Sequence, residues 1–158
     1  MDDGQQLDPR APQLWRLQAL FRLVLFWVPV AAVAGGGMAV LASTPLGLLL
    51  AATILGVQGL LALTWPALTY ERFRYALREP DLLVTRGVLF RSWTSVPYDR
   101  IQFVDTRQGP LERLFGLSRL LVYTASGAGA DAVVPGLAEE TAAELRDRLS
   151  RRGGDDGV

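Results

Sequence analysis

The 158-residue sequence has no cysteine and no histidine, and all 16 of its basic residues are arginine. The absence of cysteine excludes disulfides and zinc–thiolate sites. The absence of histidine and lysine removes the commonest general base, the commonest metal ligand and every Schiff-base nucleophile. Because 16 acidic residues cancel the arginines, the net charge is zero, which argues against a nucleic-acid partner.

Charge is also absent from the middle of the chain. Between Arg22 and Glu71 lie 48 consecutive uncharged positions, 23–70. One membrane-spanning helix needs about 20 residues, so a run of this length predicts two. A buried helical hairpin of a soluble protein is one alternative, although no polar face interrupts either helix. A cleaved signal peptide with a small-residue site at 32–34 is the other, although the apolar run continues beyond it.

The break between the two helices is expected at Ser43-Thr44-Pro45. Thr44 can act as the N-cap of the second helix, and Pro45 can take its first position. The predicted parts are a cytoplasmic segment, two spans, a cytoplasmic domain and a disordered tail: 1–22, about 23–43, about 45–70, 71–150 and 151–158.

The arginines next to the spans predict the orientation of the chain. Three precede the first span and three follow the second, whereas the connection between the spans has none. These six are Arg10, Arg16, Arg22, Arg72, Arg74 and Arg78. Because arginine is enriched in cytoplasmic loops, we expect a protein of the bacterial plasma membrane with both termini on the cytoplasmic side.

Small residues are expected to hold the two spans together, because lipid offers no hydrophobic drive for helix association. A hairpin that turns at 43–44 pairs Gly35 with Ala52, Gly36 with Ala51, and Ala31 with Gly56. The same arithmetic places Gln58 near Pro29, whose missing N–H frees the carbonyl of Leu25 for an interhelical hydrogen bond. A polar transport site at Gln58 is the alternative.

After residue 70 the pattern changes to that of a β domain. Alternating apolar residues and turn signals predict about six or seven short antiparallel strands. In one of these strands, Ile101 and Phe103 are expected to face the core, with Gln102 and Val104 opposite. One face of a helix is then indicated by the four-residue spacing of Leu137, Thr141, Leu145 and Leu149, which predicts a C-terminal amphipathic helix.

Several motifs make the chain resemble the YdbS-type bacterial pleckstrin-homology (PH) membrane proteins. They are LDPR at 7–10, LWRL at 14–17, VPYDRIQFVD at 96–105, QGPLERLFGL at 108–117 and VYT at 122–124. The resemblance implies a two-helix hairpin followed by a PH-like bent antiparallel barrel that its C-terminal helix caps. It also implies partnership with a larger related membrane protein that carries several PH-like domains.

Many PH domains bind inositol phosphates through a basic first hairpin loop. The corresponding turn here is Glu79-Pro80-Asp81, whose carboxylates repel phosphate. Five arginines near the start of the domain are candidates to face anionic headgroups instead: Arg72, Arg74, Arg78, Arg86 and Arg91. The alternative is that they lie on solvated strand faces and serve only to set the orientation.

The long central motif is a second candidate surface. The residues that would bind a peptide or another domain there are Tyr98, Arg100, Gln102, Gln108 and Arg113. The alternative is structural, with Gly109 and Gly116 permitting turns and Ile101, Val104, Leu114 and Phe115 filling the core.

The sequence offers no candidate catalytic, metal or cofactor residues. Asp99, Asp105 and Glu112 each have an arginine close by in sequence, which favours ion pairs, and the serines lack a base. These features predict a non-enzymatic, membrane-anchored interaction module with no small-molecule substrate and no cofactor. Its expected partners are membrane lipid and either a second copy or a related multi-PH-domain protein. The alternatives are an anionic-lipid headgroup sensor and an accessory subunit of a transport or export complex.

Overall fold

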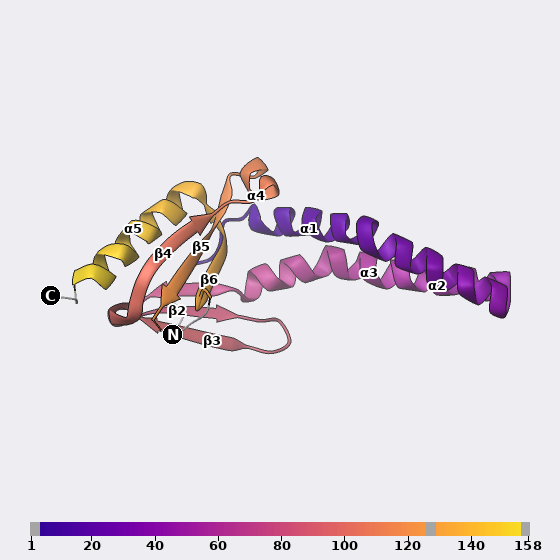
Figure 1. The fold of residues 1–158 in the computed structure, drawn as a ribbon, viewed down its shortest axis with the longest axis horizontal. Helices are drawn as coiled ribbons and strands as arrows, with labels where there is room; N and C mark the ends of the chain where they lie inside the picture. The colour runs from indigo at the N-terminus through magenta and orange to yellow at the C-terminus, as the bar shows by residue number, and fades with distance from the viewer. Residues whose placement is uncertain (1–3, 126–128, 156–158) are drawn as a thin grey trace. The chain divides into compact units, whose positions relative to one another are not determined.

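A computed structural model describes residues 4–125 and 129–155, and the chain divides into two compact units. One unit, residues 15–68, is a helical hairpin, and the other joins the N-terminal residues to everything from Thr69 onward (Figure 1). Residues 1–3, residues 126–128 and the last three residues of the predicted tail, 156–158, fall outside the described residues.

Two long apolar helices confirm the predicted hairpin. The first runs without interruption through α1 (Ala11–Arg22), a π-helical segment (Leu23–Trp27) and α2 (Val28–Leu41), and the second is α3 (Thr44–Arg72). With 31 and 29 residues, both are long enough to cross a membrane, and only 11% of each apolar window is buried. The first helix begins well before the predicted residue 23, since no glycine or proline interrupts positions 13–22.

The π-helical segment has a local cause in Pro29. Proline has no N–H, and its ring clashes with the carbonyl four residues earlier, that of Leu25. The backbone adjusts just before the proline, where the Val28 N–H bonds to the carbonyl of Leu23, five residues back. Gln58 is half-buried and makes no hydrogen bond with any described residue, so the bond predicted between Gln58 and Leu25 is absent.

The close contact between the helices lies at Gly35 and Gly47. A Cβ atom on Gly35 would lie 2.8 Å from the Gly47 carbonyl oxygen and 2.9 Å from the Cβ of Ala51. The pairings predicted for Gly36 and Gly56 are wrong, because no atom lies within 4 Å of the position that a Cβ would take on either glycine. One residue along a helix turns the side chain by about 100°, so Gly36 faces away from the contact that Gly35 makes.

Ser43 rather than Thr44 is the N-cap of α3, since the Ser43 carbonyl accepts the first helical bond, from Gly47 N–H, at 3.1 Å. The pairing of residues between the two helices is shifted by one residue from the predicted pairing. Ala52, expected opposite Gly35, is exposed, and Ala51 takes its place. Of the predicted small-residue contacts, the structure keeps Gly35 and Ala51 and adds Gly47.

The described residues of the second unit form six strands in two antiparallel three-stranded sheets. The first sheet contains β1 (Arg74–Leu77), β2 (Asp81–Arg86) and β3 (Ser92–Pro97), and the second contains β4 (Ile101–Arg107), β5 (Leu117–Thr124) and β6 (Ala132–Ala138). A short helix α4 (Pro110–Leu114) precedes β5, and α5 (Glu139–Asp155) follows β6. This architecture confirms the predicted PH-like domain with a C-terminal helix.

Two boundaries of α5 differ from the predicted ones. Leu137 belongs to β6, because the helix begins at Glu139, where two glutamates in the first turn favour the positive end of the helix dipole. The helix also continues to Asp155, so residues 151–155 are helical rather than part of a disordered tail.

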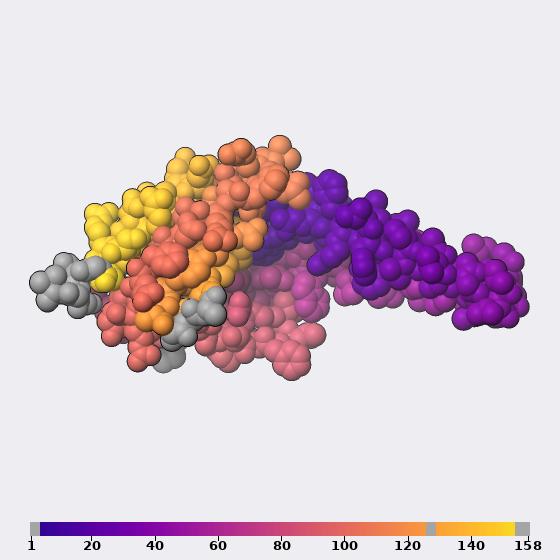
Figure 2. Space-filling model, in the orientation of Figure 1, coloured from indigo at the N-terminus to yellow at the C-terminus, as the bar shows by residue number. Residues whose placement is uncertain are grey.

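Alternating side chains of both sheets and one face of α5 form the domain core. The buried residues include Tyr75, Leu82, Val84, Val96, Val104, Leu120, Val122, Val134, Ala142, Leu145 and Leu149. Fully burying one leucine contributes about 1.5–3 kcal/mol, so these side chains fix the sheets and the helix as one body. In the space-filling view α5 lies beside β4 on the face turned to the reader (Figure 2).

Candidate functional site

The strand register separates the candidate lipid-facing arginines into two groups. Arg74 of β1 is opposite Thr85, and Arg86 of β2 is opposite Ser92. Arg74, Arg86 and Arg91 therefore lie at the end of the first sheet where the chain enters from α3, and Arg72 is in the last turn of that helix. Arg78 lies in the turn at the opposite end.

The Arg74 side chain forms hydrogen bonds with backbone carbonyls. Its Nη1 donates to the Phe73 carbonyl at 2.8 Å and to the Tyr70 carbonyl at 3.5 Å, close to the end of α3. A cation at this position stabilises the negative end of the helix dipole. Arg72, Arg86 and Arg91 are exposed instead, and none forms an ion pair with a described residue.

A hollow of about 1000 Å³ lies on the outer face of the first sheet. Its lining includes Gln6, Arg74, Arg78, Thr85 and Trp93. The lining contains cations, a hydroxyl and apolar groups but no carboxylate, so it lacks a general acid–base pair. Burial raises the pKa of Tyr75, which also borders the hollow. The guanidinium and hydroxyl groups of this lining can donate hydrogen bonds to an anion or a polar group.

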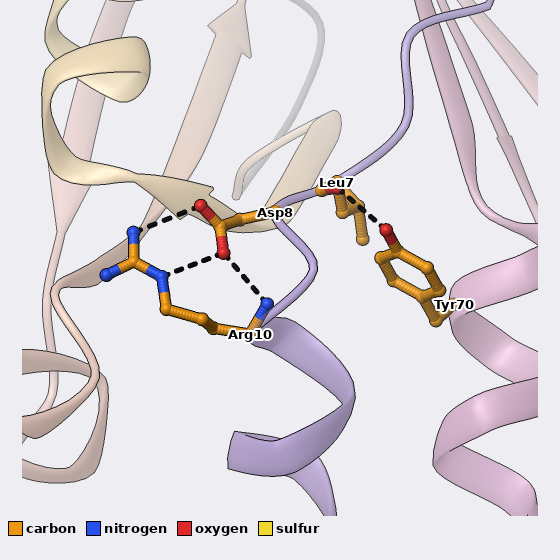
Figure 3. A network of polar contacts seen from close by, with 4 residues as sticks. All are labelled: Leu7, Asp8, Arg10 and Tyr70. Atoms are coloured by element: carbon orange, nitrogen blue, oxygen red, sulfur yellow. Dashed lines mark hydrogen bonds and ion pairs between the residues drawn. The ribbon is translucent and has the colours of Figure 1, made fainter.

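The N-terminal motif 7–10 packs onto the β domain. The carboxylate of Asp8 accepts bonds from the Arg10 backbone N–H at 2.8 Å, from its Nε at 2.9 Å and from its Nη2 at 3.1 Å (Figure 3). The hydrogen bond from the Arg10 side chain is the main cause that lowers the pKa of Asp8, against a smaller opposing effect of burial. Asp8 thus caps the turn that leads into α1, in which the Ala11 N–H donates to the Asp8 carbonyl at 2.9 Å.

The same segment is tied to the strands by its backbone. The N–H of Gln5 donates to the Tyr75 carbonyl at 2.7 Å, and the N–H of Asp8 donates to the Gly136 carbonyl at 3.0 Å. The Tyr70 hydroxyl donates to the Leu7 carbonyl at 3.2 Å (Figure 3). Residues 4–14 are therefore part of the β unit, which corrects the prediction of a separate N-terminal segment.

Two of the five candidate residues in the central motif have structural roles. Tyr98 is buried, with the Arg152 guanidinium 5.0 Å from the centre of its ring. Burial raises the pKa of Tyr98, against the opposing effect of Arg152. The Gln108 amide donates to the Leu117 carbonyl at 3.0 Å and so supports the turn before β5. These two side chains are not part of an open binding surface.

The other three candidates are exposed but do not lie together. Arg100 and Gln102 are at the start of β4, whereas Arg113 is on α4, beyond the other end of that strand. The seven residues of β4 extend over about 20 Å, so one small ligand does not reach both ends. Leu114, expected in the core, is also exposed on α4.

A β-bulge turns Phe103 out of the core. Ile101 pairs with Thr124 and Phe103 with Tyr123, so Gln102 is an extra residue in β4. The extra residue reverses the alternation, which buries Val104 and leaves Phe103 53% exposed. The Phe103 ring stacks on that of Tyr123 with centroids 4.2 Å apart and an angle of 13° between their planes. The prediction that Phe103 faces the core was therefore wrong.

Comparison with known proteins agrees with this architecture. The family model described as "Bacterial PH domain" matches residues 22–153. The chain belongs to the bacterial PH domain family. This assignment confirms the predicted resemblance, and no solved structure matches the chain significantly.

Two membrane proteins of Bacillus subtilis (strain 168) are similar to this PH-domain chain. It is 33% identical to the UPF0699 transmembrane protein YdbS over an alignment of 86 residues, and this alignment covers 54% of this chain and 52% of YdbS. It is 24% identical over 102 residues to the UPF0699 transmembrane protein YdbT, which covers 64% of this chain and 21% of YdbT. The aligned part thus spans about half of YdbS and a smaller share of YdbT.

Two of the acidic residues of this PH domain, Glu112 and Asp105, form ion pairs with arginine, the first of them buried and the second not. Glu112 is buried, where it accepts bonds from the Gly109 N–H at 2.6 Å and from Arg119 Nη2 at 2.7 Å. Asp105 pairs with Arg107 at 3.1 Å. Within residues 4–125 and 129–155, no group of acidic side chains is arranged to hold a metal ion.

Proposed function

We propose that this membrane-anchored PH domain is a non-enzymatic interaction module that assembles with a second PH-domain membrane protein or with a copy of itself. The observation that carries this proposal is Phe103, which the β4 bulge directs outward and which stacks on the half-buried ring of Tyr123. Exposed aromatic rings are enriched at protein interfaces, because a rigid ring gives a large contact area at low entropic cost.

The surroundings of the pair support a protein partner. Arg100 and Gln102 are exposed beside it and offer hydrogen-bond donors at its border. An apolar centre with a polar rim is the usual arrangement of a protein–protein interface. The two spans add affinity, because they confine both partners to one membrane and raise their effective concentration.

The proposed orientation places both termini in the cytoplasm. It is supported by the arginines beside both helices and by their absence at the connection, residues 42–43. Because the chain has no cysteine, a single Ala42→Cys or Ser150→Cys substitution gives a clean accessibility probe. We expect a membrane-impermeant maleimide to label intact cells at position 42 and not at 150. Labelling at position 150 in intact cells would overturn the orientation.

Photo-crosslinking tests the assembly. A photoreactive p-benzoylphenylalanine replaces Gln102 in the full chain, and crosslinked products from native membranes are identified by mass spectrometry. We expect a defined adduct with a second copy or with another PH-domain membrane protein, and we expect Phe103→Ser to reduce its yield. The matched control is Leu114→Ser, which changes another exposed apolar residue of the domain. Absence of a protein adduct, or equal yields from both variants, would contradict the proposal.

A further inference from the structure

The β2–β3 hairpin carries exposed apolar side chains at its tip and at the start of β3, and the proposed assembly surface does not use them. Leu89 is 75% exposed, Phe90 89% and Trp93 63%. Among the described residues, three of the five large apolar side chains exposed on the β domain belong to this one hairpin. Grouped apolar exposure of this kind marks a membrane or partner contact, whereas single exposed residues do not.

The backbone of the hairpin holds these side chains outward. Gly87 has φ of 115°, and a Cβ atom on it would collide with the Phe90 carbonyl oxygen. Only glycine adopts this conformation without strain, so the turn closes tightly beneath residues 88–90. The apolar tip is therefore a formed feature of the hairpin.

The register shows which end of the domain carries the tip. Thr85, two residues before Gly87, is opposite Arg74, the first residue of β1. Arg74 in turn follows the last residue of α3, Arg72, by two positions. The tip thus extends from the end of the sheet where the chain leaves the apolar helix.

The reach of the hairpin matches the distance from Arg74 back to Tyr70. Tyr70 ends the uncharged run, and the helical and extended rises place Arg74 within about 10 Å of it. The loop 87–91 extends up to about 8 Å past Arg86, at about 3.3 Å per residue. The tip is therefore long enough to reach back to the level of Tyr70 at the end of the uncharged run.

The charge around the tip matches an anionic surface. Arg86 and Arg91 flank the loop, and both are exposed. No acidic residue occurs between Asp81 and Asp99, so the tip presents only positive charge. Arginine next to inserted aromatic and aliphatic residues is the usual composition of segments that bind the interface of anionic membranes.

We propose that the β2–β3 hairpin is a second membrane contact, in which Leu89 and Phe90 enter the interfacial region of an anionic bilayer. Trp93 then lies at the headgroup level, and Arg86 and Arg91 contact lipid phosphates. The tip lies at the end of the sheet that directly follows α3 and carries two arginines, and this position and charge favour lipid over a protein groove as its occupant. This contact uses another surface than the assembly at Phe103, so either proposal stands without the other.

The test uses the full chain with a single engineered cysteine. Phe90→Cys carries an environment-sensitive nitrobenzoxadiazole dye, and the protein is reconstituted in phosphatidylcholine vesicles with or without phosphatidylglycerol. We expect blue-shifted emission and at least about twofold more quenching by nitroxide-labelled lipid than for the same dye at Leu114→Cys. Leu114 is a matched control, because it is 75% exposed, against 89% for Phe90, but lies on α4.

The charge and the occupant are tested in the same system. Each of Arg86→Gln and Arg91→Gln should lower the ratio of inserted to free tip about fivefold in vesicles with phosphatidylglycerol. Equal quenching at positions 90 and 114 would overturn the proposal. So would protection of the dye at position 90 that depends on protein density and is not quenched by the lipid nitroxide, because that result would indicate a protein occupant.

Discussion

The helical hairpin exposes on its surface the same apolar residue types that the β domain buries in its interior. Leucine, valine and phenylalanine cover the outside of the two helices, whereas in the β domain leucine and valine fill the core. The closest helix contact instead uses Gly35 and Gly47. The hydroxyls of Thr53 and Thr64 donate to carbonyls of α3 itself, both at 2.8 Å, so these polar groups are satisfied within the helix.

This difference shows that each region is built for its own solvent. In water, burial of apolar area drives folding, so apolar side chains collect inside. In lipid that drive is absent, and close backbone contact between small residues replaces it. The β2–β3 hairpin is the place where the β domain follows the rule of the helices, with apolar side chains outside.

The largest test of the comparison is a matched pair of leucine truncations. Leu82 is fully buried in the β domain, and Leu48 is exposed on α3. We expect Leu82→Ala to lower the free energy of unfolding of the β domain by about 2–5 kcal/mol, because it removes contacts and leaves a cavity. Leu48→Ala should change it by less than about 0.5 kcal/mol.

Urea titration of the full chain in mild detergent, followed by near-ultraviolet circular dichroism, measures both variants. Equal effects of the two substitutions would show that the exposed leucines of α3 pack against something in the folded protein. That outcome would break the comparison between the two regions.

A second pair, of glycines, tests the contact between the helices. A Cβ on Gly47 would collide with the Gly35 carbonyl oxygen and would lie 2.7 Å from the Cβ of Ala39, whereas a Cβ on Gly36 would meet no atom within 4 Å. We expect Gly47→Ala to destabilise the hairpin by about 1–3 kcal/mol through overpacking. Gly36→Ala should be neutral or stabilising, because alanine favours helix by about 1 kcal/mol over glycine.

Unfolding of the two glycine variants in mixed micelles with rising dodecyl sulfate, followed by far-ultraviolet circular dichroism, gives the difference directly. If Gly36→Ala were the more damaging variant, the contact would lie on the face first predicted from the sequence.

Features with a local cause were predictable from the sequence. The charge gap of 23–70 gave both spans, and the periodicities gave the strands and the C-terminal helix. The motif around Tyr98 identified the family. The Asp8-Pro9 pair was also a visible N-cap signal, and it would have moved the start of the first helix.

Features that depend on register or on distant contacts were not predictable. One extra residue at Gln102 reverses the alternation of β4, and no residue type there marks a bulge. A shift of one residue at the helix connection moves the contact from Gly36 to its neighbour. The role of Arg74 depends on where α3 ends, so composition alone made it one more candidate for lipid.

The smallest expected effect concerns Asp8, a polar group that joins the first helix to the β domain. Asp8→Ala removes the capping bond to the Arg10 N–H and should lower the free energy of unfolding by about 1 kcal/mol. Asp8→Asn is the matched control, because asparagine keeps the cap acceptor for the Arg10 N–H and loses only the charge.

The pH dependence separates the cap from the ion pair. Because the folded pKa of Asp8 lies below its ordinary value of 3.8, its ionised form stabilises the fold above that value. This contribution is lost as the pH falls from about 4 through the folded pKa, so wild type and Asp8→Asn should converge in acid and separate near neutrality. Urea titrations at several pH values measure this convergence. A constant difference between the two proteins would show that the Arg10 pair adds nothing, and that Asp8 acts through its cap alone.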